Sequence, residues 1–371
     1  MRILGVLKES ARDDRVAIIP GLECLSCFRT LVESGAGGRA GFDDAAYRRA
    51  GAEVVSRAEV LARADVIACV RRPRDVEKLR AGQLLVGMLD PLGDPEAMLA
   101  LAQRGVRAAA LELLPRTTRA QAMDVLTSLA TVSGYKAAIL AASLLPRFFP
   151  LLMTAAGTVP PARVLVIGAG VAGLSALATA RRLGAVCVGY DVRAAARDQI
   201  ISVGARPLDL GVEVSADGRD GYASALSQET LGAQQRALDE HVRRSDVLIT
   251  TASVPGSRAP VLVARSSILG MKPGSVVVDL AGERGGNTEV SRLDETVTCG
   301  GVTVLSPSDL SRTVPFHASQ LYSRNLANFL STLGPELHFE RSDPIASAVL
   351  VTEGGAVVHP EVSRRIERKA G

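Results

Sequence analysis

The segment "RVLVIGAGVAGLSALATARRLGAVCVGYD", residues 163–191, constrains the fold of this chain more than any other. A short apolar run leads directly into Gly168, Gly170 and Gly173, spaced G-x-G-x-x-G, and a helical stretch follows at once. In this context the first glycine permits a tight turn, the second lets the backbone approach a pyrophosphate, and the third allows close packing of helix on strand. The segment therefore predicts the first strand, turn and helix of a dinucleotide-binding fold, with Val171 and Ala172 completing the binding turn.

Asp191 ends the next apolar run, eighteen positions after Gly173 (191 − 173 = 18). A carboxylate there can accept hydrogen bonds from the adenosine ribose hydroxyls and repels a 2′-phosphate, which favours NAD(H). Arg193, two residues on, could instead bind a 2′-phosphate, so NADP(H) at this site stays an alternative.

Further short apolar runs alternate with helical segments, a pattern typical of parallel sheets. They begin at residues 2, 65, 83 and 106, and again at residues 163, 186, 205, 246, 275 and 302. We predict two α/β domains, of which the second is a Rossmann doubly wound parallel sheet. The expected bounds are 1–135 for the first domain, completed by 315–371, and 136–314 for the second. The C-terminal return is expected to include a hairpin that turns at Gly354 and Gly355.

Composition excludes several classes of protein. The 371 residues are 47% hydrophobic and 22% charged, and a net charge of +4 is spread without basic blocks, so no nucleic-acid partner is expected. The most apolar stretch, 137–157, is interrupted by Pro146, Arg147 and Pro150, which predicts a soluble, cytoplasmic chain without a membrane span. No metal site is expected from the four histidines, and a packing role is favoured for the Cys24 and Cys27 pair over a redox or zinc role.

One interval, "GVEVSADGRDGYASALSQETLGAQQ" from residue 211, is long and polar for a connection between a strand and a helix. It predicts a mobile functional loop with Tyr222 at its tip, and a plain surface insertion is the alternative.

Several segments together resemble the NAD(H)-binding component, or domain I, of proton-translocating nicotinamide nucleotide transhydrogenase, a relative of alanine dehydrogenase. The clearest are "DDRVAIIP" at 13, "PRTTRAQAMDVL" at 115, "MTAAGTVPPARVLVIGAGVAGL" at 153, "DGYA" at 220, "KPGSVVVDLA" at 272 and "SQLYSRNLANFL" at 319. The resemblance implies a homodimer of two-domain subunits with NAD(H) between the domains. It also implies hydride transfer to NADP(H) on a separate domain III, and a membrane subunit that would place this chain at the inner face of the cell membrane.

The resemblance also implies site residues. Arg116, Gln121 and Asp124 match its nicotinamide-side positions, and Gly221, Tyr222, Thr250 and Ala252 match segments that line the cofactor. The stretch from about 118 to 148 is expected to be largely helical, and on a helix Gln121, Asp124 and Ser128 would share a narrow polar face. The alternative is a capping box formed by Thr118 and Gln121, which would explain Gln121 but neither Arg116 nor Asp124.

The sequence departs from the family pattern at several places. Thr127, which keeps a hydroxyl beside the nicotinamide-side residues, replaces a serine, and Thr131 replaces an asparagine. The segment 20–28 is about three residues short, and Ser253 replaces a leucine.

Two other functions remain open. In one, a related dehydrogenase reduces a small oxo acid or imine with Arg15, Arg71 and Glu283 as a carboxylate-binding and proton-transfer set, with structural salt bridges as the alternative role for these charges. Alanine dehydrogenase chemistry itself is disfavoured because Arg71 and Met88 occupy the positions of the lysine and histidine that it requires, and Met88 can neither donate nor accept a proton. In the other, the chain is a non-catalytic NAD-binding partner protein.

Overall fold

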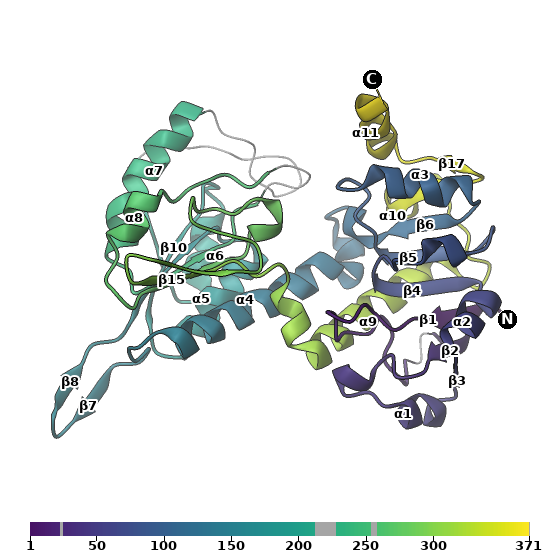
Figure 1. The fold of residues 1–371 in the computed structure, drawn as a ribbon, viewed down its shortest axis with the longest axis horizontal. Helices are drawn as coiled ribbons and strands as arrows, with labels where there is room; N and C mark the ends of the chain where they lie inside the picture. Colours follow the sequence, from purple (N-terminus) through teal and green to yellow (C-terminus); the bar gives the residue numbers. More distant parts are fainter. Residues whose placement is uncertain (23–24, 212–227, 254–257, 371) are drawn as a thin grey trace. The chain divides into compact units, whose positions relative to one another are not determined.

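The computed structural model describes residues 1–22, 25–211, 228–253 and 258–370. They form two compact units, one of Met1–Leu129 with Arg312–Gly371 and one of Ala130–Ser311 (Figure 1). Each unit is an α/β structure around its own sheet.

Unit 1 contains an eight-stranded sheet in the order β17-β16-β6-β5-β4-β1-β2-β3. Its strands are β1 (Ile3–Val6), β2 (Arg29–Glu33), β3 (Glu53–Val55), β4 (Val66–Arg71), β5 (Leu84–Met88), β6 (Arg107–Ala110), β16 (Leu350–Glu353) and β17 (Ala356–Val357). All pairs are parallel except β16 with β6 and β16 with β17, which are antiparallel. The predicted hairpin at Gly354 and Gly355 is thus confirmed, and β16 joins it to the sheet through β6.

One face of this sheet is covered by helices that share a hydrophobic core with it. The helices are α2 (Arg57–Arg63), α3 (Pro95–Gln103) and α11 (Pro360–Ala370), and their buried residues pack with those of β2, β4, β5 and β16. The remaining helices of the unit are α1 (Asp44–Arg49), α9 (Pro315–Leu333), α10 (Pro344–Val349) and the 3-10 helices η2 (Gly38–Ala40), η3 (Val76–Lys78), η4 (Leu111–Leu113), η5 (Thr118–Met123) and η8 (Leu310–Thr313), the last of which starts in unit 2.

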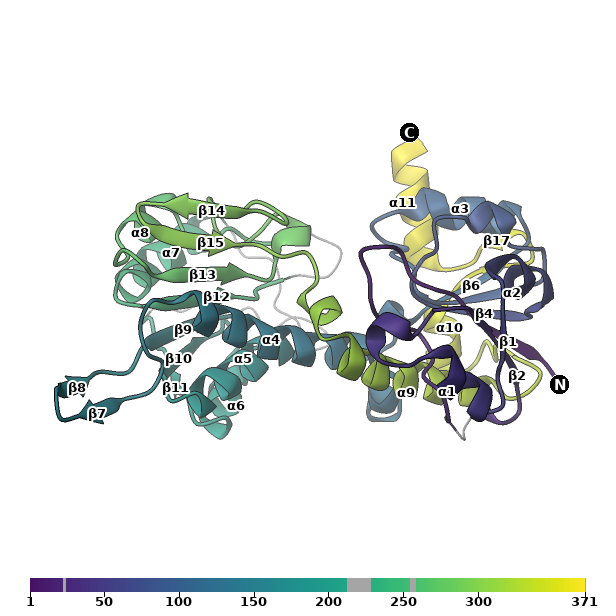
Figure 2. The ribbon, with the colours of Figure 1, turned by 60° about the horizontal axis from the view of Figure 1, so that its bottom comes forward.

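Unit 2 contains a seven-stranded sheet in the order β11-β10-β9-β12-β13-β15-β14 (Figure 2). Its strands are β9 (Arg163–Ile167), β10 (Val186–Tyr190), β11 (Arg206–Pro207), β12 (Val247–Thr250), β13 (Val276–Asp279), β14 (Thr296–Cys299) and β15 (Val302–Leu305). The six runs predicted from residue 163 onward are the six parallel strands. β14 was not predicted; it pairs antiparallel with β15 across a turn at Gly300 and Gly301, both of which have positive φ.

Helices cover both faces of this sheet, as the doubly wound fold requires. On one face α4 (Val125–Leu144), α5 (Val171–Arg182) and α6 (Ala196–Ser202) share a core with alternate residues of β9, β12 and β13. On the other face α7 (Gln228–Arg243) and α8 (Arg265–Leu269) pack on the intervening residues of the same strands. The 3-10 helix η7 (Gly282–Arg284) follows β13.

A hairpin that the sequence did not predict precedes β9. β7 (Leu152–Thr154) and β8 (Gly157–Val159) pair antiparallel and project from the body of unit 2 (Figure 2). Although the hairpin is apolar in part, Met153 is 76% exposed and Leu151, just before it, is 53% exposed.

The stretch 118–148 is largely helical, as predicted, but it consists of two helices, so the prediction that Gln121, Asp124 and Ser128 share a face of a single helix is wrong. A 3-10 helix, η5, ends at Met123; Asp124 then adopts an extended conformation (φ −73°, ψ 92°), and α4 begins only at Val125. The packing role predicted for Cys27 is also wrong because this thiol is exposed in a turn, and Cys24 lies outside the described residues.

Candidate functional site

The three glycines of the G-x-G-x-x-G turn occupy positions with different steric demands. Gly168 has φ +94°, and a Cβ there would lie 2.7 Å from Thr251 Oγ1. A Cβ on Gly173 would lie 1.8 Å from the carbonyl oxygen of Gly168, so the helix could not pack as it does. A Cβ on Gly170, in contrast, would meet nothing within 4 Å, so its missing side chain leaves open space for a ligand.

The start of α5 offers positive potential beside that open space. The first hydrogen bond within the helix runs from the Leu174 N–H to the Gly170 carbonyl, so the amides of Val171, Ala172 and Gly173 have no acceptor within the helix. No side chain caps this end. Amides and helix dipole together suit an anion, and the bare Gly170 lets a pyrophosphate reach them.

Asp191 follows β10, and its carboxylate faces the glycine turn. Its Oδ2 accepts from the Ala169 N–H at 2.7 Å. Arg193 donates to the same carboxylate from its backbone N–H and from its guanidinium, at 2.9 Å in each contact. The carboxylate is therefore held at the turn, where a ribose-binding acid is expected, but Arg193 covers it.

The residues after β12 support the turn from the other side. The Thr251 hydroxyl donates to the Gly168 carbonyl at 2.8 Å, while Thr250 is fully buried and its hydroxyl has no partner among the described residues. Ala252 exchanges two hydrogen bonds with the Asn287 side chain. Asn287 is in turn fixed by its N–H to the buried Asp279 carboxylate at 2.7 Å.

These contacts identify residues that support the predicted site residues and that sequence reasoning missed. Thr251 and Asn287 position the predicted residues Gly168 and Ala252, but no local pattern marks them. Gly134 of α4 is a third such position, since a Cβ there would lie 2.0 Å from the Ala172 carbonyl. Gln234 of α7 is fully buried and donates to the Tyr190 hydroxyl at 3.0 Å, while its Oε1 has no partner among the described residues.

The turn lies at the point where the strand order reverses. β9 lies between β10 and β12, so the segments after β9 and after β12 leave the sheet at its carboxyl edge in opposite directions. Ligands of open α/β sheets bind in the crevice at this switch point.

In unit 1, the segment with Arg116 and Gln121 is held by helices from the C-terminal part of the chain. The side-chain amides of Asn325 and Asn328, on α9, both donate to the Ala122 carbonyl, at 2.9 and 3.0 Å. Arg119 pairs with Asp343 before α10. Gln121 and Arg116 themselves have exposed side chains.

Asp124 caps α4. Its Oδ1 accepts from the Thr127 N–H at 2.9 Å, and its Oδ2 accepts from the Thr127 hydroxyl at 2.6 Å. The alternative capping box of Thr118 and Gln121 is wrong, because no side chain caps η5. A helix cap is therefore present in this segment, but Asp124 makes it at the start of α4, and not Thr118 with Gln121.

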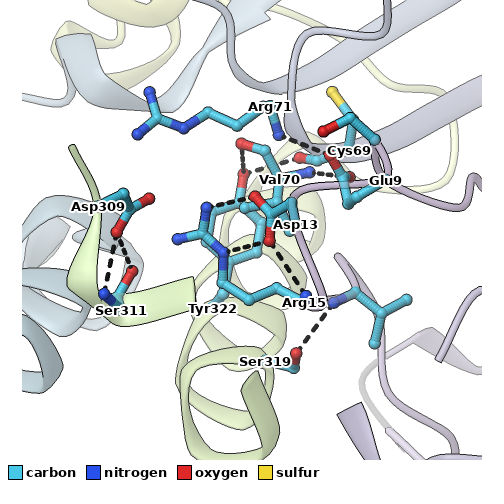
Figure 3. A network of polar contacts seen from close by, with 12 residues as sticks. Glu9, Asp13, Arg15, Cys69, Val70, Arg71, Asp309, Ser311, Ser319 and Tyr322 are labelled. Atoms are coloured by element: carbon cyan, nitrogen blue, oxygen red, sulfur yellow. Dashed lines mark hydrogen bonds and ion pairs between the residues drawn. The ribbon is translucent and has the colours of Figure 1, made fainter. Parts of the chain in front are cut away.

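α9 also fixes the segment 13–19 through a row of buried polar groups (Figure 3). The Ser319 hydroxyl accepts from the Val16 N–H at 2.9 Å, and the Tyr322 hydroxyl donates to the Cys69 carbonyl at 2.8 Å. Within the segment, Asp13 binds the buried Arg15 guanidinium through both carboxylate oxygens. Two of the donor nitrogens of Arg15 are therefore occupied by a protein carboxylate.

A cavity of about 300 Å³ in unit 1 is lined by the loops that follow β1 and β4, by the end of β4 and by the start of α2; Glu9 and Arg71 are among its residues. The Glu9 carboxylate accepts from the N–H groups of Val70 and Arg71, at 2.6 and 3.2 Å (Figure 3). Burial nevertheless dominates and raises the pKa of Glu9 to about 7. Arg71 is paired in register with Met88 on β5. Met88 stands where alanine dehydrogenase has its histidine, and a methionine can neither donate nor accept a proton there.

The other predicted positions lie apart from these contacts. Gly221 and Tyr222 lie outside the described residues, Ser253 is exposed, and Glu283 lies in η7. The Thr131 carbonyl accepts from the Ser175 hydroxyl at 2.7 Å, so this position helps to join α4 to α5.

Within the described part of the chain, no group of three or more His, Cys, Asp or Glu side chains could hold a metal ion. Among the described helices, α4 alone is long and apolar enough to cross a membrane, yet its Ala137, Ala138 and Ala141 are fully buried in the core of unit 2. Core helices of globular proteins commonly have this composition.

Comparison with known proteins agrees with this architecture. The family model "Alanine dehydrogenase/PNT, N-terminal domain" matches residues 5–133, and "Alanine dehydrogenase/PNT, C-terminal domain" matches residues 137–360. The chain is 40% identical over 372 residues to an NAD(P) transhydrogenase alpha subunit of Rhodospirillum rubrum, covering 95% of this chain and 96% of that protein. It is 32% identical over 298 residues to alanine dehydrogenase of Bacillus subtilis, covering 77% and 72%.

A solved structure extends the likeness to three dimensions. The transhydrogenase from Sinorhizobium meliloti superposes with a TM-score of 0.85 at 42% identity, covering 96% of this chain and all of that one. The chain therefore belongs to the alanine dehydrogenase/PNT family of nicotinamide nucleotide-binding oxidoreductases and is homologous to transhydrogenase alpha subunits.

Proposed function

We propose that this protein binds NAD(H) and passes hydride between NADH and NADP⁺ held on a separate domain III, as one component of a nicotinamide nucleotide transhydrogenase. The observation that carries the proposal is the glycine turn. Gly170 leaves open space beside the first amides of α5, which have no acceptor within the helix, while packing requires glycine at positions 168 and 173. The likeness to transhydrogenase alpha subunits over nearly the whole chain supports it.

The residues of unit 2 would bind the dinucleotide. The amides of Val171, Ala172 and Gly173 bind the pyrophosphate, and Asp191 accepts hydrogen bonds from the adenosine ribose. Ala252, just after β12, is proposed to lie at the nicotinamide end of the crevice, with the buried Thr250 at the end of β12 beneath it. Gly221 and Tyr222 are proposed to cover the cofactor, on the family resemblance alone.

The residues of unit 1 would orient the nicotinamide. Arg116, Gln121 and Asp124 hold its carboxamide and ribose, and Thr127 fixes the Asp124 carboxylate. When bound, NADH supplies the hydride. The protein contributes the position of the ring, and positioning is the main source of rate enhancement in such a transfer.

The partners follow from the same proposal. NADP(H) is bound only on domain III, and a membrane subunit holds the assembly at the inner face of the cell membrane. We also propose a homodimer, because an isolated subunit would leave the apolar residues around the β7–β8 hairpin in water; these are Phe148, Leu151, Met153 and Val159.

Steady-state and stopped-flow assays of the purified chain with NADH and a purified domain III carrying NADP⁺ test this function. We expect transfer that needs both proteins. Binding of NADH without any transfer to NADP⁺ would overturn the transhydrogenase role.

A second candidate is a stand-alone dehydrogenase of the same family that reduces a small oxo acid or imine. The cavity bordered by Arg71 favours it, since a cation suits a carboxylate substrate. Two observations weigh against it: Asp13 occupies two donor nitrogens of Arg15, and Met88 supplies no proton. A screen of oxo acids and imines with NADH distinguishes this dehydrogenase from the transhydrogenase component. If the protein binds NADH but neither reduces any of these compounds nor transfers hydride to NADP⁺, the third function, a non-catalytic NAD-binding protein, is supported.

A further inference from the structure

We infer that Arg193 is a latch on the ribose site: in the free protein it occupies the carboxylate of Asp191, and it must turn away before a nucleotide can bind there. The inference rests on the proposed NAD(H) site and adds a residue that controls access to it.

All the acceptor positions of Asp191 are filled. An ionised carboxylate has about four acceptor sites, two on each oxygen. Oδ1 accepts from the backbone N–H and Nε of Arg193, and Oδ2 accepts from the Ala169 N–H and Arg193 Nη2, at 2.7–2.9 Å. The two hydroxyls of an adenosine ribose would find no site open to them.

Only the guanidinium can make room. The two backbone donors belong to the glycine turn and to the turn after β10, so they move only if the main chain moves. The Arg193 side chain, in contrast, has rotatable bonds and is 19% exposed, so its guanidinium can leave the carboxylate without movement of the main chain. Ribose binding therefore exchanges two guanidinium hydrogen bonds for two hydroxyl hydrogen bonds.

This exchange of hydrogen bonds makes the binding of the nucleotide less favourable. Two parallel bonds from a guanidinium to a carboxylate are among the stronger hydrogen bonds in proteins, and this pair is shielded, since Asp191 is only 7% exposed. Ribose hydroxyls are neutral donors and give weaker bonds. The free protein is thus closed at this subsite, and its affinity for NAD(H) is lower than Asp191 alone would allow.

Titration of NADH by fluorescence, with the full chain and the variants Arg193→Lys and Arg193→Gln, tests the latch. Lysine keeps the positive charge beside Asp191 but cannot make the two-pronged contact, and glutamine removes the charge as well. We expect the dissociation constant for NADH to fall about three- to tenfold in both variants. The matched control is Arg197→Gln on α6. The Arg197 side chain is 58% exposed and its Nη1 lies 3.9 Å from Asp209 Oδ2, so NADH affinity should stay unchanged.

A second measurement tests the latch without relying on a change of NADH affinity in the variants. In NMR spectra of the free protein, the Arg193 Nε–H signal, assigned by its loss in Arg193→Lys, should exchange slowly with water and should shift or broaden when NADH is added. Weaker NADH binding in both variants, or in Arg193→Gln alone, would show that Arg193 is a direct ligand and would overturn the latch. A wild-type chain that binds no NADH would contradict the proposed function itself, and the latch with it.

Discussion

The Asp124 carboxylate accepts hydrogen bonds from both the backbone N–H and the hydroxyl of Thr127, at 2.9 and 2.6 Å, and so begins α4. One acidic side chain thereby has two tasks: it caps a helix, and in the proposed function it faces the nicotinamide. Two substitutions separate these tasks because asparagine caps helices about as well as aspartate, whereas alanine does not.

We predict that Asp124→Asn leaves the thermal stability nearly unchanged and reduces hydride transfer to NADP⁺ about tenfold or more, since the charge is lost while the cap is kept. Asp124→Ala should lower the free energy of unfolding by about 1 kcal/mol as well. Thermal melts and the two-protein transfer assay measure both quantities. If Asp124→Asn transferred hydride at the wild-type rate, Asp124 would be a helix cap and nothing more.

The glycine turn gives a second pair of variants with opposite outcomes. Gly173→Ala forces a Cβ toward the Gly168 carbonyl, 1.8 Å away, and should destabilise the protein by about 1–3 kcal/mol. Gly170→Ala has an ordinary backbone conformation (φ −75°, ψ −170°) and open space, so stability should stay within about 0.5 kcal/mol.

For Gly170→Ala we expect the dissociation constant for NADH to rise about tenfold, because the new methyl group takes the place of the pyrophosphate. Denaturant titration and NADH fluorescence give the two readouts. Normal NADH affinity in Gly170→Ala would mean that no pyrophosphate lies against this residue.

Glu9 should make stability depend on pH. Burial raises its pKa from 4.5 to about 7, so the folded protein holds a proton that the unfolded chain has already released. Its contribution to stability is therefore complete below about pH 4.5 and is lost as the pH rises through 7. Between these values Glu9 alone should lower the free energy of unfolding by up to about 1.4 kcal/mol per pH unit.

Glu9→Gln cannot release the proton, so its stability should fall less steeply than that of wild type between about pH 5 and 7. Urea titrations across this range measure the slope. Glu77→Gln, which changes an exposed glutamate of the same unit, is the control. Parallel curves for Glu9→Gln and wild type would show that Glu9 is ionised throughout.

The β7–β8 hairpin should carry the proposed dimer contact. Leu151→Ser with Met153→Ser removes two apolar side chains that are 53% and 76% exposed, and should weaken dimerisation at least tenfold while leaving the fold intact. Ile201→Ser, on the exposed side of α6, is the matched control at 52% exposure. Analytical ultracentrifugation over a range of concentrations decides it, and an unchanged dimer constant in the double variant would place the interface elsewhere.

The sequence by itself determined the features that depend on neighbouring residues. The apolar runs became the parallel strands β1, β4, β5 and β6 and the six of unit 2, since buried parallel strands are apolar throughout. The glycine turn and Asp191 were likewise fixed by a spacing of a few residues, and Gly354 and Gly355 marked their hairpin. Two strands of unit 1 were missed: β2, which begins with the polar residues Arg29 and Thr30, and β3, which has only three residues.

Only the tertiary structure decided which residues, far apart in the sequence, form hydrogen bonds with one another. Ser319 and Tyr322 meet segments more than 250 positions away, and Asn325 holds Ala122 across 203 positions. The division of the helical stretch into η5 and α4 at Asp124 lies beside these contacts to Ala122, which helical periodicity alone does not show. The closure of Asp191 by Arg193 was also hidden, because a sequence names the groups that can bind a ligand, whereas side-chain packing decides which of them are already occupied.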